Sequence, residues 1–143
     1  MKSIFDDISQ EISQLTTKRY STSFSLGISL LNKSIQKPIY AIYGFVRFAD
    51  EIVDSFHGFD KEFLLADFKT QTYRAIEEKI SLNPILNSFQ WAVNTYNIPL
   101  DLIETFLNSM EMDLDSTDYE QIEYETYILG SAEVVGLMCL QVF

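Results

Sequence analysis

The sequence lacks the features of several broad protein classes. Ten Lys and Arg residues stand against 21 Asp and Glu, and the formal net charge is −11. Clustered basic residues, which neutralise the phosphates of nucleic acids, do not occur, so we expect no nucleic-acid partner. The same negative charge opposes electrostatic docking on anionic lipid.

Cysteine and long apolar runs are also scarce. The single cysteine, Cys139, cannot form an internal disulfide, which favours a reducing cytoplasm. It lies in the apolar run VVGLMCLQVF, where we expect a small buried side chain rather than a nucleophile. The first residues carry no signal-peptide core, and no apolar run approaches the roughly 18 residues of a membrane span. These absences predict a soluble protein without a transmembrane segment.

What the sequence does contain is helical periodicity. Hydrophobic residues make up 47% of the chain, which argues against disorder. Apolar residues recur three and four positions apart, and no strand-like alternation or linker stands out. The sequence therefore predicts a single all-α domain over residues 1–143, with helices near residues 3–17, 20–34, 38–56, 61–80, 84–96, 99–114 and 118–143.

Prolines and capping residues place the predicted helix ends. The three prolines each precede an apolar periodic segment, as proline in a first helical turn does. Asn83 is the expected N-cap before Pro84, and Thr117 with Glu120 has the spacing of a capping box. Helical spacing predicts apolar stripes at Ile4, Ile8, Ile12 and Leu15, and at Phe63, Ala66, Tyr73 and Ile76.

The last predicted helix reaches Phe143 without a glycine cap, a basic last turn or a polar tail. An apolar helix left open in this way normally continues or finds a partner. We therefore expect the chain to be the N-terminal part of something longer, or one half of an assembly.

The segment YGFVRFADEIVD, residues 43–54, combines charged and apolar residues on one predicted helix. At about 100° per residue, its polar side chains fall within an arc of roughly 60°. These are Tyr43, Arg47, Asp50 and Asp54. The opposite side, an arc of roughly 160°, is apolar, so the polar stripe is expected to face a polar cavity or a ligand.

Two interpretations of this stripe follow from its chemistry. Two carboxylates one turn apart offer hard oxygen ligands to Mg²⁺, which commonly also binds substrate phosphates. An arginine on the same stripe offers a planar fork for a phosphate. The alternative is a structural ion-pair stripe in which Arg47 pairs with Asp50, although that pairing leaves Asp54 uncompensated.

The same residues resemble the first aspartate-rich motif of the squalene/phytoene synthase family, the head-to-head trans-prenyl transferases. That motif has a tyrosine, an arginine four positions on and a DxxxD three further, as in Tyr43, Arg47 and DEIVD. Two further blocks agree in order and spacing. RYSTSFSLGISLL, residues 19–31, resembles the serine-rich stretch of the family. SMEMDL, residues 109–114, and YILGSAEVVGLM, residues 127–138, resemble its Met-x-Met-Asp-Leu block and glycine-containing helix.

The resemblance implies a role for each matching residue. Asp50 and Asp54 would hold Mg²⁺, or Mn²⁺ in its place. Catalytic roles would fall to Tyr43, Arg47 and Tyr127. The substrate would be bound by Ser21, Thr22, Ser23, Phe24, Tyr43, Arg47 and Gly136. Phe24 can equally be a core aromatic, and the small residues Gly130, Ala132 and Gly136 can equally serve close helix packing.

The chain also departs from the family pattern. Ser109 and Glu133 stand where glycine is usual, and we expect Glu133 on the outer face of its helix. His57 is expected in a solvated loop. The second aspartate-rich helix of the family lies beyond the glycine block and has no counterpart here. The implied fold is thus a truncated isoprenoid-synthase-type helical bundle around a central cavity.

The implied reaction is the head-to-head condensation of two prenyl diphosphates, with geranylgeranyl diphosphate and phytoene favoured by the bacterial phytoene synthase-like wording of the motifs. A squalene or dehydrosqualene synthase, a non-catalytic helical assembly or a lipid-binding protein are the alternatives. We expect the 143-residue chain alone to show little turnover. We also expect it to self-associate through the face that truncation leaves open. An apolar product leaves a peripheral membrane contact open for an otherwise cytoplasmic protein.

Overall fold

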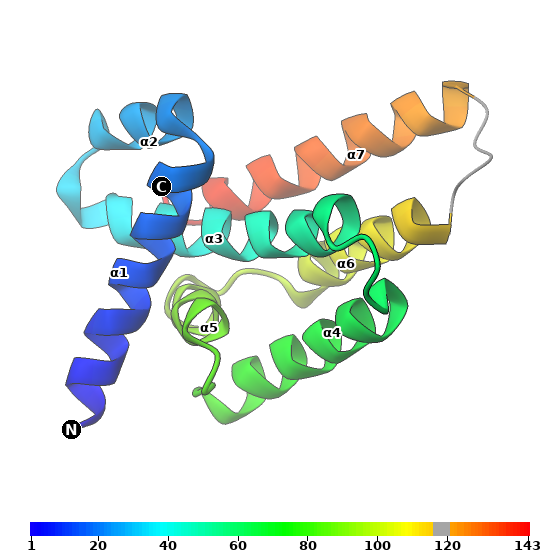
Figure 1. Cartoon of the computed structure of the whole chain (residues 1–143). Helices are drawn as coiled ribbons and strands as arrows, with labels where there is room; N and C mark the ends of the chain where they lie inside the picture. Colours follow the sequence, from blue (N-terminus) through cyan, green and yellow to red (C-terminus); the bar gives the residue numbers. More distant parts are fainter. Residues whose placement is uncertain (116–120) are drawn as a thin grey trace.

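The structure, a computed structural model, describes residues 1–115 and 121–143, with side chains described at residues 1–114 and 131–143. Within these ranges it is built of helices joined by turns and loops and contains no strand, so the all-α prediction is confirmed (Figure 1). The helices are α1 (Lys2–Tyr20), α2 (Thr22–Ser29), α3 (Lys33–Ser55), α4 (Lys61–Glu78), α5 (Pro84–Tyr96), α6 (Leu100–Asp115) and α7 (Gln121–Leu140).

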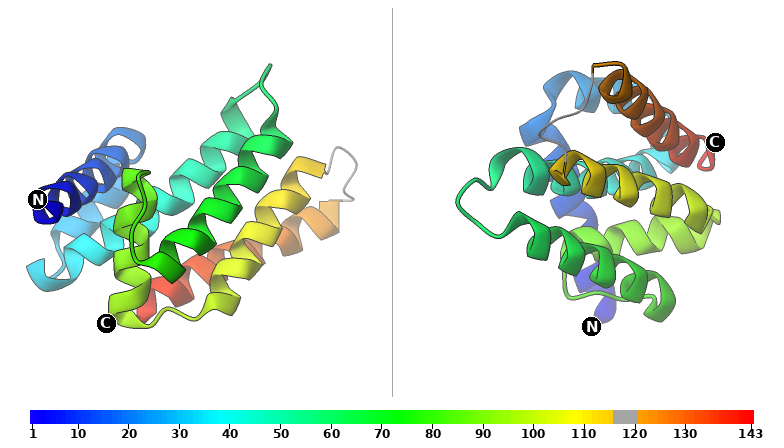
Figure 2. Two further views of the ribbon diagram at one scale, coloured as in Figure 1. Left: turned by 90° about the horizontal axis from the view of Figure 1, so that it is seen from below. Right: turned by 90° about the vertical axis from the view of Figure 1, so that its right-hand side faces the viewer.

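Helix α3 is the centre of the bundle. It contacts each of the other six helices, while α6 and α7 pack against one another beside it (Figure 2). The ring of Phe45 on α3 is fully buried and stacks on Phe89 of α5 with ring centroids 3.8 Å apart. Phe68 of α4 and Phe106 of α6 complete this aromatic core. Because Phe45 points into the core, the rotation of α3 about its axis is fixed.

The apolar side of α3 agrees with the sequence prediction in all but its last turn. Eight apolar residues between Ile42 and Phe56 lie on the side predicted to be apolar. Six of them are buried, Phe48 is half-buried, and Phe56 is exposed where α3 ends. The buried ones are Ile42, Phe45, Val46, Ala49, Ile52 and Val53.

Helix α1 departs from its predicted apolar stripe at three of four residues. Ile4, Ile8 and Leu15 are exposed, while Ile12 is half-buried and packs against the core. The buried side chains of α1 are hydroxyls, namely Ser9, Ser13, Thr16 and Thr17. The reason is close helix approach. Gly44 of α3 leaves so little room that an added Cβ would lie 3.3 Å from Ser13 Oγ, and only small side chains fit there. The hydroxyls of Thr16 and Thr17 are satisfied by carbonyls one turn earlier on α1.

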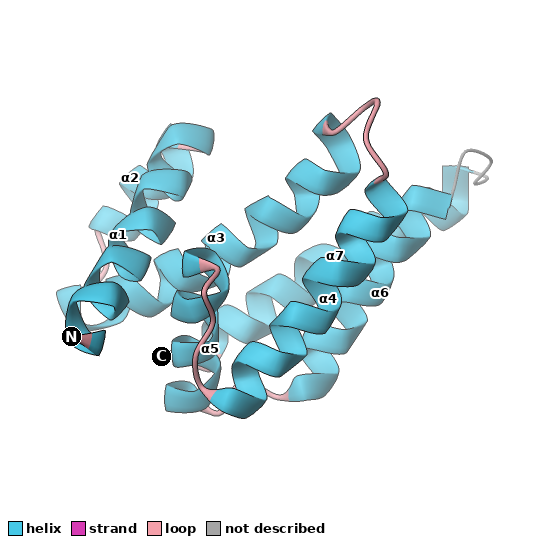
Figure 3. Ribbon diagram, turned by 60° about the horizontal axis from the view of Figure 1, so that its bottom comes forward, coloured by secondary structure: helices cyan, strands magenta, loops and turns pink. Residues whose placement is uncertain are grey.

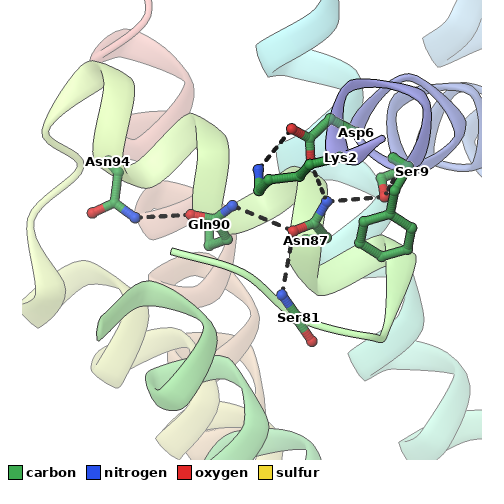
Figure 4. A network of polar contacts seen from close by, with 8 residues as sticks. Lys2, Asp6, Ser9, Ser81, Asn87, Gln90 and Asn94 are labelled. Carbon is green, nitrogen blue, oxygen red and sulfur yellow. Dashed lines mark hydrogen bonds and ion pairs between the residues drawn. The ribbon is translucent and has the colours of Figure 1, made fainter. Parts of the chain in front are cut away.

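A buried polar network joins α1 to α5 (Figure 4). The side chain of Asn87 is almost fully buried and donates to Asp6 Oδ1 at 2.9 Å and to Ser9 Oγ at 3.1 Å. Its own oxygen accepts from the backbone N–H of Ser81. The hydroxyls of Ser13 and Ser88 also meet between the two helices. Since buried polar groups must be paired, this network fixes how α1 sits on α5.

The predicted stripe on α4 is wrong in its first half only. Phe63 and Ala66 are exposed, whereas Tyr73 and Ile76 are half-buried and pack against the core. Helix α4 packs with α3, α5 and α6, and the residues it buries most are Leu65, Phe68, Thr72 and Ala75.

Two predicted helix boundaries are wrong between residues 20 and 38. The chain breaks at Ser21, whose hydroxyl accepts from the N–H of Phe24 and caps α2. It breaks again before Asn32, which caps α3 through the N–H of Ser34. Pro38 therefore lies inside α3 rather than in its first turn. Capping by Asn32 outweighed the preference of proline for a helix start.

The remaining boundaries agree closely with the prediction, and the connections are short (Figure 3). Asn83 caps α5 by accepting from the N–H groups of Ile85 and Leu86, as its position before Pro84 predicted. Thr117 and Glu120 lie outside the described residues. Among the described residues, no helix combines the length and hydropathy needed to cross a membrane.

Candidate active site

The polar stripe of α3 contains an arginine held on two sides. The Arg47 Nη2 atom lies 2.6 Å from Glu51 Oε2, while Nη1 lies 3.9 Å from Asp50 Oδ2. The guanidinium also lies over the ring of Tyr20, 4.5 Å from the ring centroid. The Arg47–Asp50 ion pair of the alternative interpretation is therefore the longer of two contacts, and the main partner of Arg47 is Glu51, one turn further on.

Asp50 lies in a negative environment. Burial raises its pKa to about 6, and the charges of Asp54 and Asp113 add to that rise while Arg47 opposes it. Burial and Asp54 also raise the pKa of Asp113. Helix α6 thus brings a third carboxylate toward the pair on α3. Membership of Asp113 in the SMEMDL block was one indication of this, but helical spacing on α3 alone could not reveal it.

Asp54 is exposed, so this part of the stripe does not face a closed cavity among the described residues. The start of α4 lies close to the end of α3. Lys61, in the first turn of α4, donates to the carbonyl of Val53 at 2.6 Å, and its positive charge partly opposes the rise in the pKa of Asp113. A cation therefore lies at the same end of α3 as the carboxylates.

Tyr43 begins the stripe and marks where it meets apolar surface. Its ring stacks on that of Phe24 from α2, with centroids 4.4 Å apart and planes 22° apart. Phe24 is thus neither a core residue nor isolated, since it is 40% exposed and lines a cavity.

That cavity has a volume of about 530 Å³ and lies between α2, the first turns of α3 and the end of α7. Its lining is almost entirely apolar, and on the α7 side it includes the small residues Ala132 and Gly136. An added Cβ at Gly136 would meet nothing within 4 Å. The lining residues include Ser23, Phe24, Ile28, Ile39, Ala132 and Gly136. Glu133 is exposed and does not line the cavity.

The family model for squalene/phytoene synthases matches residues 17–143. The chain belongs to this family. A search of curated proteins gives no match.

Two solved structures show the fold of this squalene/phytoene synthase family member. One is a dehydrosqualene synthase in complex with ligand, which matches with a TM-score of 0.82 and 24% identity over 96% of this chain and 48% of its own. The other is the squalene synthase HpnC from Alicyclobacillus acidocaldarius, with a TM-score of 0.81 and 23% identity over 94% of this chain and 51% of its own. The chain therefore has the all-α isoprenoid synthase fold, and it spans about half the length of both structures.

The carboxylates of α3 suit a divalent cation of the hard type. Asp50 and Asp54 offer oxygen ligands, and their mutual repulsion would be relieved by a positive ion between them. Among the described residues, no group of three or more acidic, His or Cys side chains is arranged to hold a metal. This donor set fits Mg²⁺, which takes few protein ligands and keeps water or phosphate for the others.

The other residues named from the sequence lie on α2, in a loop and on α7. Ser21, Thr22 and Ser23 lie together at the start of α2, with Ser21 acting as its cap. His57 is an exposed loop residue, and burial raises the pKa of Cys139 to about 11, as expected of an inert thiol. The side chains of Tyr127 and Gly130 lie outside those that the structure describes. Glu51, Tyr20 and Asp113 were not predicted as site residues.

Proposed function

We propose that this chain provides the first aspartate-rich half of the active site of a head-to-head prenyl transferase. The observation that supports this most is the continuity between a charged stripe and an apolar cavity through the stacked rings of Phe24 and Tyr43. A prenyl diphosphate has the same two parts, a highly charged head and a long apolar tail. Its head would lie at Arg47 and Asp50, and its tail in the cavity between α2 and α7.

In this proposal each part of the chain has a distinct task. The Arg47 guanidinium binds diphosphate oxygens through its planar fork. Asp50 and Asp54 would hold Mg²⁺, which would supply positive charge to neutralise a diphosphate. The hydroxyls at the start of α2 orient the phosphates, and the apolar cavity excludes the water that would trap an allylic cation. Tyr127 is proposed to lie near the reacting carbons.

We propose geranylgeranyl diphosphate as the substrate and phytoene as the product, because the amino-acid sequences of the motifs resemble those of bacterial phytoene synthases. Turnover of geranylgeranyl diphosphate and farnesyl diphosphate by the intact protein would be compared. A clear preference for farnesyl diphosphate would place the protein with the squalene or dehydrosqualene synthases instead.

The test of the proposed activity is the Asp50→Asn variant of the intact protein. We expect it to lose prenyl diphosphate turnover and the Mg²⁺-dependent protection against thermal unfolding that a prenyl diphosphate analogue gives the unmodified protein. Asp101→Asn, which removes an exposed acid in the first turn of α6, is the matched control. Full activity in the Asp50→Asn variant would refute the assignment. Protection without Mg²⁺ and without turnover would favour a lipid-binding protein.

The 143-residue chain by itself should show little turnover, since it spans about half of the matched structures. Its apolar residues near the cavity are strongly exposed, with Leu30 at 83% and Phe143 at 66%. Large exposed apolar patches are poorly tolerated, so we propose that a second copy covers this face in the isolated chain. Sedimentation at micromolar concentration should show a dimer or larger species, and a monomer would contradict the proposal.

A further inference from the structure

The DEIVD segment contains three acids, and the middle one, Glu51, makes the shortest contact with Arg47. Glu51 turns toward Arg47, with 2.6 Å between its Oε2 atom and Nη2. Its side chain is 19% exposed. Ser55 of α3 and Tyr20 of α1 also hydrogen-bond to the Glu51 side chain. The hydrogen-bond partners of Glu51 are therefore on α3 and α1, and the contact with Arg47 is shorter than the 3.9 Å between Arg47 Nη1 and Asp50 Oδ2.

Tyr20 approaches the same guanidinium from another helix. It is the last residue of α1 and directly precedes Ser21, the cap of α2. The Arg47 Cζ atom lies over this ring, 4.5 Å from its centroid, while Nη2 contacts Glu51. Contacts from two side chains on different helices restrict the orientation of a planar group more than one contact does.

The arginine is nevertheless not fully satisfied. Its Nε atom is buried and has no hydrogen-bond partner among the described residues. A buried donor without a partner is uncommon and requires an explanation. The contacts of Arg47 restrict its orientation and, in the described part of the chain, still leave a free donor on the guanidinium. This is the arrangement expected of a side chain that is preorganised to bind an anionic ligand.

We propose that Glu51 and Tyr20 are positioning residues that hold the Arg47 guanidinium ready for the diphosphate. This inference rests on the proposed function, and it assigns the middle acid of DEIVD to the arginine rather than to the metal. Tyr20 links the two parts of the site, because it directly precedes the serine-containing start of α2 and its ring contacts Arg47 on α3. Neither residue needs to touch the substrate.

The test measures binding of inorganic pyrophosphate in Mg²⁺ buffer to the intact protein, by calorimetry. We expect Arg47→Ala to weaken binding about 100-fold and Glu51→Gln about tenfold, as charge-assisted hydrogen bonds suggest. Glu51→Asp keeps the charge but is too short to reach Nη2, so it should behave like Glu51→Gln. Tyr20→Leu should weaken binding about threefold, with Tyr20→Phe closer to the unmodified protein.

The decisive measurement is the double variant. If Glu51 acts through Arg47, adding Glu51→Gln to Arg47→Ala should cause no further loss, because the group that Glu51 positions is already gone. Glu77→Gln, an exposed acid on α4, is the control for charge and should bind as the unmodified protein does. Thermal unfolding of each variant checks that it is folded.

Two failures can be told apart. If the unmodified protein binds no Mg²⁺–pyrophosphate, the proposed function fails and the positioning role fails with it. If it binds, and the losses of Glu51→Gln and Arg47→Ala multiply in the double variant, only the positioning role is overturned. Binding by Glu51→Asp equal to that of the unmodified protein would also overturn it, since negative charge alone would then suffice.

Discussion

The ring of Phe24 lies on the ring of Tyr43, 4.4 Å between centroids, so that α2 and α3 meet at the boundary between charged and apolar surface. Residue 24 lines the cavity, and residue 43 begins the stripe that continues to Arg47. The contact therefore joins the two parts of the proposed site.

Removal of this contact should separate tail binding from head binding. Phe24→Ala takes away one wall of the cavity and the partner of Tyr43, so we expect about tenfold weaker binding of a prenyl diphosphate analogue. Binding of inorganic pyrophosphate, which has no tail, should change little. Calorimetry with the two ligands checks this, and Phe63→Ala, an exposed aromatic on α4, is the control. Equal loss for both ligands would contradict the proposed tail position.

Two glycines should respond to alanine in opposite directions. An added Cβ at Gly44 would lie 3.3 Å from Ile85 Cδ1 and Ser13 Oγ and 3.4 Å from the Ser13 Cα atom. These neighbours must give by a few tenths of an ångström, so we expect a loss of about 1–3 kcal/mol. At Gly136 an added Cβ meets nothing within 4 Å, and alanine should stabilise α7 by about 0.5–1 kcal/mol. Denaturant unfolding of both variants measures the difference. A stabilising Gly44→Ala would show that α1 does not pack as closely as described.

The stability of the metal-free protein should depend on pH through Asp50. Its pKa is raised from 3.8 to about 6 in the folded protein, so the folded state binds this proton more tightly than the unfolded state does. Its contribution therefore stabilises the fold below about pH 4 and is lost as pH rises toward 6.

The Asp50→Asn variant isolates this effect. With EDTA present, it should be more stable than the unmodified protein at pH 7.5, by on the order of 1 kcal/mol because the carboxyl is partly screened by solvent. The difference should vanish near pH 4. Glu77→Gln changes net charge equally and should show no such trend. Thermal unfolding at several pH values makes the comparison, and a difference independent of pH would contradict it.

The polar network between α1 and α5 should be costly to break. Asn87→Ala leaves Ser9 and Asp6 without a buried donor, so we expect a loss of about 2–3 kcal/mol. Asn94→Ala removes two hydrogen bonds at an exposed position of the same helix and should cost less than half as much. Urea unfolding compares the two. Equal costs would mean that burial of Asn87 contributes nothing.

The sequence predicted the fold class and most of α3 because a nearly enclosed helix shows its apolar side directly. It failed on α1, where close approach to Gly44 buries serine and threonine and leaves isoleucine outside. The spacing of hydrophobic residues does not reveal a buried helix face made of small polar residues. The break near residues 30–32 could have been predicted from Asn32, an N-cap residue type that stands six positions before Pro38.

Helical spacing predicted the candidate site only along α3, with Tyr43, Arg47 and Asp50. The family resemblance added Ser23, Phe24 and Gly136, which line the cavity. Asp113 and Tyr20 come from other helices and depend on packing, so they were not predicted as site residues. Glu51 could have been found, since Arg and Glu four apart on a helix commonly pair. It was missed because the two aspartates already explained the motif.

Helix α1 is a rod about 28 Å long that is tied at its start to Asn87 and carries Tyr20 at its other end. A slip of one residue along α5 would turn that rod by about 100° and swing the tyrosine away from the arginine. Loss of the Asn87 side-chain amide should thus displace Arg47, the proposed pyrophosphate-binding group, without removing any atom of that group. Variants that loosen the first turns of α1 are therefore expected to fold and yet to bind pyrophosphate more weakly, if the proposed function holds.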